Sequence, residues 1–188
     1  MMAQFEVTMA GFGGQGVMVA GQLLAYAGIK EGKNVVWLPS YGPEMRGGTA
    51  YCTVVVSEKR IGSPIINTPQ AICVFNRPSF DKFTPRVRAG GLVMVNSSLI
   101  NTRTERTDVT EILVPCNQMA MAAGSGKATN IAMLGAFIGA SSIVEFATIQ
   151  AIVEEKLGKK KEVLEINLRV LDEGYRLGAE SAFVRSRV

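Results

Sequence analysis

The chain has 188 residues, of which 47% are hydrophobic and 19% charged, a balance that suits one well-cored globular domain and excludes a disordered chain. The formal charge of +4 is mild, and the one basic run, at residues 159–161, separates two helical patterns, so we expect no nucleic-acid partner. The sequence has no histidine and only three scattered cysteines, which excludes the commonest general base, the commonest zinc ligand and a four-thiolate iron–sulfur site. We therefore expect neither catalytic residues nor metal ligands on this chain, and any redox cofactors on other chains.

Strand-like and helical patterns alternate through the first two-thirds of the chain, and a series of helices follows. Short apolar or β-branched runs predict strands at 5–10, 34–39, 49–57, 71–75, 92–95 and 111–114. Apolar residues at helical spacing predict helices at 15–30, 78–83, 118–123, 131–143, 147–157 and 161–183. The alternation predicts an α/β fold with a mostly parallel sheet in a three-layer α/β/α arrangement, and we expect one domain over residues 1–188.

No segment of the sequence predicts secretion or membrane insertion. The start lacks a basic region followed by an apolar one, and the longest uncharged stretch, 128–144, is shorter than the ~20 apolar residues of a spanning helix. An odd number of scattered cysteines fits a reducing compartment better than a disulfide framework. We expect a cytoplasmic protein without a membrane span.

A glycine-rich motif, Gly11-Phe12-Gly13-Gly14-Gln15-Gly16, lies between the first predicted strand and the first predicted helix. Its glycines permit a tight turn, and the helix start presents free N–H groups to an anion. A dinucleotide site requires an acidic residue about 20 residues further on, and the stretch 35–39 has none. This absence counts against NAD or FAD and leaves two interpretations, a tight turn without a ligand and a contact to a phosphate or a partner subunit. The polar amide of Gln15 favours recognition.

The second unusual loop is Tyr41-Gly42-Pro43-Glu44-Met45-Arg46-Gly47-Gly48. In a parallel sheet it leaves the carboxyl end of the second strand, as the glycine motif leaves the first, so the two loops should lie side by side where open α/β folds bind ligands. Arg46 is able to pair with a phosphate or carboxylate through two hydrogen bonds. The alternative is an internal salt bridge between Glu44 and Arg46 that only fixes the loop.

The predicted helix 131–143 carries Gly135 and Gly139 in its interior. Each interior glycine destabilises a helix by up to about 1 kcal/mol relative to alanine. We therefore expect another backbone to approach this helix closely. Its own sheet is the favoured candidate, and another subunit is the alternative.

The two loops, taken in order, resemble the gamma subunit or gamma domain of the 2-oxoacid:ferredoxin oxidoreductases. That family shows G-x-G-G-Q-G after the first strand and Tyr-Gly-x-Glu-x-Arg-Gly-Gly before a later strand. The resemblance continues through Asn76-Arg77-Pro78-Ser79 and Gly90-Gly91-Leu92 to Asn130 and residues 134–136, and so covers about residues 5–180. It implies that residues 1–188 form a single gamma domain, of the 2-oxoglutarate or branched-chain 2-oxoacid type.

The resemblance also implies a function for the complex. The complex decarboxylates a 2-oxoacid oxidatively, with 2-oxoglutarate favoured, forms the acyl-coenzyme A and reduces ferredoxin. Thiamine diphosphate, Mg²⁺ and iron–sulfur clusters belong to alpha and beta subunits and to a ferredoxin-like delta subunit or ferredoxin, and this chain alone binds no cofactor. The chain helps form the coenzyme A or partner side through Gly11, Gly13, Gly14, Gln15, Gly16, Tyr41, Gly42, Glu44, Arg46, Gly47 and Gly48. A stand-alone nucleotide- or coenzyme A-binding domain and a purely structural assembly subunit remain alternatives.

Overall fold

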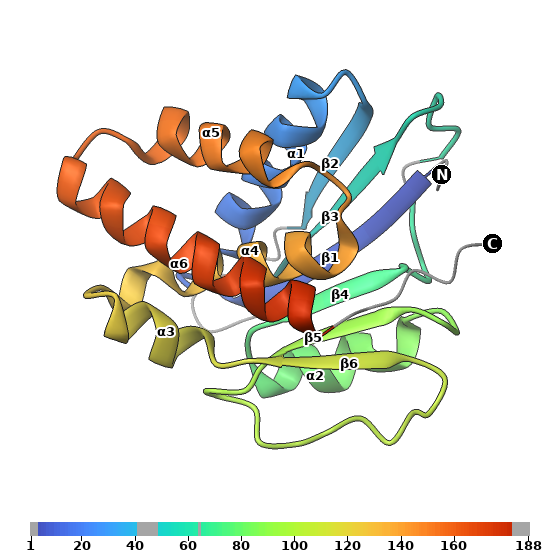
Figure 1. The fold of residues 1–188 in the computed structure, drawn as a ribbon. Helices are drawn as coiled ribbons and strands as arrows, with labels where there is room; N and C mark the ends of the chain where they lie inside the picture. The colour runs from blue at the N-terminus through green and yellow to red at the C-terminus, as the bar shows by residue number, and fades with distance from the viewer. Residues whose placement is uncertain (1–3, 41–48, 64, 182–188) are drawn as a thin grey trace.

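The computed structural model describes residues 4–40, 49–63 and 65–181 (Figure 1). Within these residues a six-stranded sheet runs in the order β2-β3-β1-β4-β5-β6. Its strands are β1 (Gln4–Phe12), β2 (Asn34–Ser40), β3 (Thr49–Ser57), β4 (Ala71–Val74), β5 (Leu92–Asn96) and β6 (Thr110–Val114). The α-helices are α1 (Val17–Lys30), α2 (Arg77–Phe83), α3 (Cys116–Ala122), α4 (Thr129–Ser141), α5 (Phe146–Leu157) and α6 (Lys161–Glu180), with the 3-10 turns η1 (Thr84–Arg86) and η2 (Gly126–Ala128).

The sheet is mostly parallel, as the sequence predicts. β1, β4, β5 and β6 pair in parallel, whereas β3 runs antiparallel to both β1 and β2. The exception follows from chain length, because eight residues, 41–48, connect β2 to β3, and a parallel crossover needs a dozen or more. β2 therefore points the same way as β1, and the carboxyl ends of both strands lie at one edge of the sheet.

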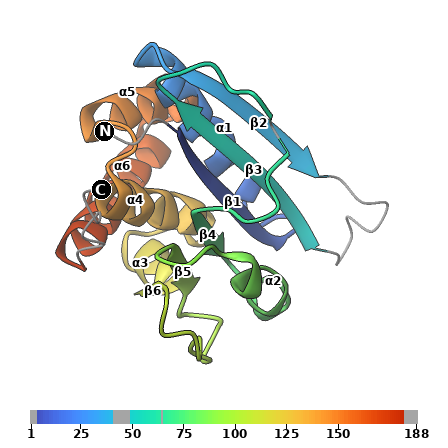
Figure 2. The same ribbon diagram turned by 90° about the vertical axis from the view of Figure 1, so that its right-hand side faces the viewer.

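The three predicted layers are present, but they are unequal. α1, α4, α5 and α6 pack on one face of the sheet and form the larger core with Phe5, Val7 and Met9 of β1 (Figure 1). On the other face, α2 and η1 cover β4 and β5 through a smaller cluster that includes Phe80 and Phe83. On that side the described helices reach β3 only near its start, where the ring of Phe83 in α2 lies 5.0 Å from that of Tyr51 (Figure 2).

The backbones of α4 and α6 approach each other closely. A Cβ at Gly135 would lie 2.2 Å from the carbonyl oxygen of Leu171, and one at Gly178 would lie 2.0 Å from that of Ala136. Gly139 and Gly174 have equally close backbone neighbours on the opposite helix. The expectation of a close backbone is confirmed, but its favoured location was wrong, because the backbone belongs to α6 and not to the sheet. α4 lies between the two, and its spacing of apolar residues does not say which side is closer.

Two further properties concern the described residues. None of their helices is long and apolar enough to cross a membrane. Cys52, Cys73 and Cys116 are free and buried. Burial raises the pKa of the Cys52 thiol to about 12 and raises those of Cys73 and Cys116 well above the ordinary range. These thiols therefore stay protonated at neutral pH and do not act as nucleophiles.

Candidate functional site

The glycine motif forms the turn between β1 and α1. The amide of Gln15 donates to the carbonyl of Phe12 at 3.1 Å and closes the turn. Gly14 and Gly16 have φ angles of 94° and 75°, in the left-handed region that glycine adopts without strain. The strand–turn–helix context that the motif requires is therefore present.

Gly16 also brings the start of α4 against the start of α1. A Cβ at Gly16 would lie 2.6 Å from Nδ2 of Asn130. That nitrogen donates a hydrogen bond of 3.1 Å to the carbonyl oxygen of Gly16. A side chain at position 16 would separate the two helix starts, so glycine is needed here for packing as well as for φ.

The side chain of Gln15 is engaged within the chain. Its Oε1 accepts from the amide of Phe12 at 2.7 Å and from Nδ2 of Asn76 at 3.1 Å, and its Nε2 donates to the carbonyl of Phe75 at 3.4 Å. A Cβ at Gly11 would lie 2.7 Å from the same Oε1. Gln15 therefore holds the loop against the end of β4. It also lines the cleft described below, so its predicted role in recognition stays a prediction.

Buried asparagines continue this network along the carboxyl edge of the sheet. Oδ1 of Asn76 accepts from the amide of Ser79 at 2.9 Å and caps α2. Nδ2 of Asn96, at the end of β5, donates to Oδ1 of Asn117 at 2.9 Å and to the carbonyl of Phe75 at 3.4 Å. The loops that follow β1, β4 and β5 are thus tied to one another, which fixes the edge at which a ligand would bind.

A cleft of about 750 Å³ opens beside the glycine turn. Its walls are Gly14, Gln15 and Gly16 with the first turn of α1, the segment 124–131 that includes η2 and the start of α4, and residues 162–167 of α6. This volume lies within the range of about 300–1,000 Å³ that is usual for small-molecule sites. Among the predicted glycines, Gly11 and Gly13 do not line the cleft.

Several groups in the walls of the cleft favour an anion, and one lining residue, Glu162 of α6, is acidic. Neither α1 nor α4 has a side-chain N-cap or an acidic residue in its first turn. The first amides of a helix have no intrahelical acceptor and carry the positive end of its dipole, so the start of α1 can bind a phosphate or carboxylate. α4 continues directly from η2, in which the Ser125 side chain already accepts from the amide of Lys127. The Lys127 side chain is exposed and forms no ion pair with a described residue.

The opposite wall of the cleft is mixed. Asn167 of α6 is buried and lines the cleft. Val19 and Val163 line it too, and both side chains are exposed. Within the described part of the chain, no cluster of acidic residues and cysteines is arranged to hold a metal ion. The cleft is therefore suited to binding an anionic ligand with an apolar part.

Six predicted site residues, Tyr41, Gly42, Glu44, Arg46, Gly47 and Gly48, lie outside the described residues, and so does the alternative salt bridge between Glu44 and Arg46. Their roles stay predictions. Thr49, the residue that follows them, is the register partner of Phe12 in the β1–β3 pair. The chain therefore enters β3 beside the glycine turn, and β3 lies between β2 and β1. The expectation that the two loops are neighbours stays a prediction.

The sequence analysis missed Lys127 and Asn167. The run Gly124-Ser125-Gly126-Lys127 is a second glycine-rich segment that directly precedes a helix, and it could have been found by the same reasoning as the first. Asn167 gave no such signal, because nothing local distinguishes a polar residue that faces a cleft from one that faces solvent.

Comparison with known proteins points to the same family as the two loops. A family model described as pyruvate ferredoxin/flavodoxin oxidoreductase matches residues 6–177. The chain belongs to this family. It is 40% identical over 173 residues to the ketoisovalerate oxidoreductase subunit VorA of Methanothermobacter marburgensis, covering 91% of this chain and 36% of that protein. It is 32% identical over 178 residues to the 2-oxoglutarate synthase subunit KorC of Methanocaldococcus jannaschii, covering 93% and 94% respectively.

Solved structures of the family have the same fold. The gamma subunit of a keto/oxoacid ferredoxin oxidoreductase from Geobacter sulfurreducens aligns with a TM-score of 0.82 and 25% identity, over 94% of this chain and 99% of that one. The pyruvate oxidoreductase subunit PORC of Thermotoga maritima aligns with a TM-score of 0.77 and 25% identity, over 93% and 96%. The predicted resemblance to gamma subunits is confirmed. The chain spans a little over a third of the length of the VorA relatives that it matches.

Proposed function

We propose that this chain is the gamma part of a 2-oxoacid:ferredoxin oxidoreductase and forms one wall of its coenzyme A site, with residues 1–188 as a single gamma domain. The proposed complex decarboxylates a 2-oxoacid oxidatively, transfers the acyl group to coenzyme A and reduces ferredoxin. The observation that carries the proposal is the cleft at which Lys127, at the turn that leads into α4, meets the uncapped start of α1.

Coenzyme A matches the chemistry of this cleft. Its nucleotide end carries several phosphate groups, which suit Lys127 and the free amides at the start of α1. The remainder of the molecule is less polar, which suits the exposed Val19 and Val163 beside them. Binding of the nucleotide end here leaves the thiol end free to reach an acyl group on another chain.

The proposal assigns this chain binding and positioning, and no chemical step. Thiamine diphosphate, Mg²⁺ and the iron–sulfur clusters belong to the proposed alpha and beta subunits and to a delta subunit or ferredoxin. This division fits a chain with no histidine and with cysteines held protonated in its core.

Two substrates of the complex are supported by different observations. The sequence motifs favour 2-oxoglutarate, and KorC proteins align over nearly their whole length. The higher identities, 40% and 37%, are to ketoisovalerate proteins, which favours a branched-chain 2-oxoacid. Assay of the purified complex with 2-oxoglutarate and with ketoisovalerate separates the two, because one should give the higher kcat/KM by at least tenfold.

Substitution of Lys127 tests the proposed coenzyme A contact. In the assembled complex, Lys127→Ala should raise the KM for coenzyme A about tenfold, which corresponds to the loss of about 1.4 kcal/mol of binding. The kcat at saturating coenzyme A should stay within twofold of the wild-type value. Lys59→Ala is the matched control, since Lys59 is exposed and does not line the cleft.

Hydrogen exchange gives an independent measurement. Coenzyme A should slow exchange of the amides in the glycine turn and in segment 124–131 of the assembled complex. Equal exchange with and without coenzyme A, together with an unchanged KM in Lys127→Ala and in Arg46→Ala, would support the purely structural subunit instead.

A further inference from the structure

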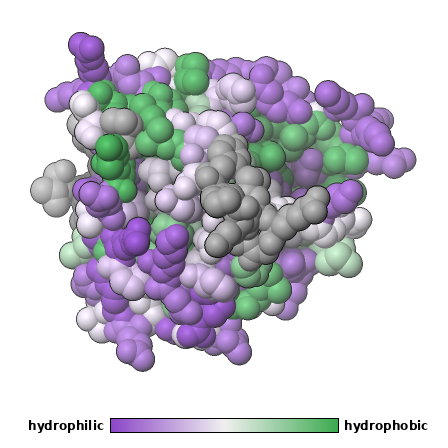
Figure 3. Space-filling view, turned by 180° about the vertical axis from the view of Figure 1, so that it is seen from behind, coloured by the Kyte–Doolittle hydropathy of each residue, from purple (hydrophilic) through white to green (hydrophobic). Residues whose placement is uncertain are grey.

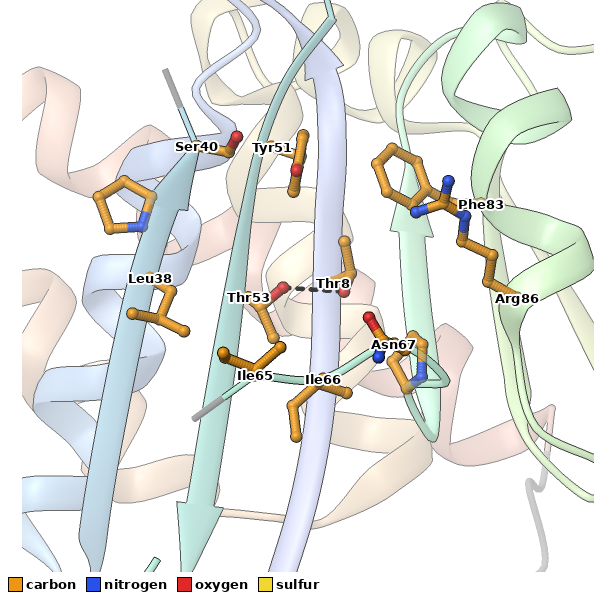
Figure 4. A pocket seen from close by; sticks show the side chains of 12 residues that line it. Thr8, Leu38, Ser40, Tyr51, Thr53, Ile65, Ile66, Asn67, Phe83 and Arg86 are labelled. Carbon is orange, nitrogen blue, oxygen red and sulfur yellow. Dashed lines mark hydrogen bonds between the residues drawn. The ribbon is translucent and has the colours of Figure 1, made fainter. Parts of the chain in front are cut away.

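A second concave site lies on the side of the sheet that the described helices leave open. Figure 3 shows the molecule from behind, where separate apolar patches lie among strongly polar surface. The site has a volume of about 270 Å³ and is bounded by β1, β2 and β3, by Phe83 and Arg86, and by the segment 65–69. In Figure 4 the segment with Ile65 and Ile66 crosses in front of the strands, with β2 on one side and Arg86 on the other.

The floor of this site is polar. The hydroxyl oxygens of Thr8 on β1 and Thr53 on β3 lie 3.1 Å apart, and both side chains are buried (Figure 4). Each hydroxyl has one proton to donate, and a single hydrogen bond between the two uses only one of them. The second proton has no acceptor among the hydrogen bonds of the described residues, so it is available to an oxygen from outside the chain.

One wall of the site is basic. The guanidinium carbon of Arg86 lies 5.6 Å from the centre of the Phe83 ring, and Nζ of Lys82 lies 5.2 Å from that of Tyr51. Neither cation pairs with a carboxylate of the described residues, and no acidic residue lines the site.

Three other arginines in this part of the chain have carboxylate partners. Arg77 pairs with Asp81, Arg103 with Glu111, and Arg106 with Asp108. Arg86 is therefore the guanidinium at this site that is left for a carboxylate from elsewhere, with the fixed pair of donors that such a group accepts.

The facing wall is apolar and exposed. Leu38 at the end of β2 is 38% exposed and Ile65 is 74% exposed. The site is also smaller than the usual small-molecule pocket of about 300–1,000 Å³, whereas the coenzyme A cleft, at about 750 Å³, falls well within that range. The site has room for only a few side chains, and exposed apolar side chains lie beside it. These two properties fit a segment of a protein better than a free metabolite.

We propose that this groove, defined by Leu38, Tyr51, Thr53, Ile65 and Arg86, docks an acidic segment of another subunit of the complex. An Asp or Glu of that segment pairs with Arg86, and a neighbouring apolar side chain covers Leu38 and Ile65. The proposal rests on the proposed function only in requiring a partner subunit. The groove is separate from the coenzyme A cleft, because the two share no lining residue.

The test measures how tightly this chain assembles with the other subunits of its complex. Arg86→Glu should weaken assembly at least tenfold, because it sets a carboxylate against a carboxylate, and Ile65→Ser should weaken it by a smaller factor. Arg88→Glu makes the same charge change on an exposed arginine that does not line the groove, and it should change assembly less than twofold. Substituting the partner's acid by Arg should restore assembly with Arg86→Glu.

Three results contradict the inference in different ways. Equal assembly of Arg86→Glu and Arg88→Glu, with wild-type assembly intact, overturns the docking groove and leaves the proposed function standing. Binding of succinate that Arg86→Glu abolishes while assembly is unchanged makes the groove a small-anion site instead. Failure of the wild-type chain to assemble at all counts against the proposed function itself, and against this docking with it.

Discussion

Two glycine-rich regions of this chain use the same residue for opposite purposes. At the crossing of α4 and α6, Gly135 and Gly178 are surrounded, and a Cβ on either would enter the backbone of the facing helix. In the turn after β1, Gly14 has φ of 94° and a Cβ there would meet nothing within 4 Å. Glycine removes volume in the first region, whereas in the second it supplies a backbone conformation and leaves open space.

The glycines at the crossing of α4 and α6 belong to the packed core, whereas those of the turn belong to the candidate site. A stripe of small residues marks a close contact when another backbone fills the space beside it. On α4 and α6, each helix supplies that backbone for the other. Gly14 of the turn lines the cleft, and the open space beside it is available to a ligand. The glycines are spaced four residues apart in α4 and α6 and are clustered within six residues in the turn, and their surroundings in the fold differ accordingly.

The largest effect should come from the helix crossing. In Gly178→Ala the new Cβ would meet the carbonyl oxygen of Ala136 at 2.0 Å, and a backbone atom has no rotamer by which to move away. We expect the free energy of unfolding to fall by about 3 kcal/mol, at the upper end of the usual overpacking effect, despite the better helix propensity of alanine. Urea denaturation measures the change.

Gly62→Ala is the control for that substitution. Gly62 lies in a loop, and a Cβ there would meet nothing within 4 Å. Its effect should stay within about 0.5 kcal/mol. The contrast between the two regions fails if Gly178→Ala is no more destabilising than Gly62→Ala.

A smaller effect is expected within the turn itself. Gly16→Ala places alanine at φ of 75° and forces Asn130 away, and it should destabilise the fold by about 2 kcal/mol. Gly14→Ala carries only the conformational strain, so about 1 kcal/mol is expected. Parallel thermal and urea denaturation of both variants checks the order. Equal losses would mean that the contact between Gly16 and Asn130 contributes nothing.

The element boundaries were the most predictable feature of the fold. The strand predicted at 49–57 is β3 itself, and the remaining strands agree to within two residues at each end. Local composition suffices for this, since β-branched runs and helical periodicity depend on neighbours in the sequence. The antiparallel direction of β3 follows from the short connection before it, which the sequence also contained.

Long-range partners could not be predicted in the same way. Gly135 clearly required a close neighbour, but the identity of α6 as that neighbour depends on residues 36 and more positions away. The part that Gln15 plays in holding the loop could not be predicted, because its three partners, Phe12, Phe75 and Asn76, come together only in the fold. The same holds for Lys127, which becomes notable only where two helix starts meet.

An effect on stability similar to that of Gly14→Ala should come from Gln15. Gln15→Met keeps the length of the side chain and removes its hydrogen bonds to Phe12, Phe75 and Asn76. Since water can reach part of this loop, a loss of about 1 kcal/mol in the free energy of unfolding is expected. The KM for coenzyme A should rise by less than in Lys127→Ala. A larger rise would indicate that Gln15 contacts coenzyme A as well as holding the loop in place.

The buried thiols of Cys52, Cys73 and Cys116 can report transient unfolding of the core. Burial raises the pKa of Cys52 to about 12, so alkylating reagents that require a thiolate find almost none in the closed molecule. Each opening of the core exposes ordinary, reactive cysteines. The rate of alkylation at neutral pH therefore counts opening events without any added probe, and it would show directly whether a substitution loosens the core or alters only the cleft.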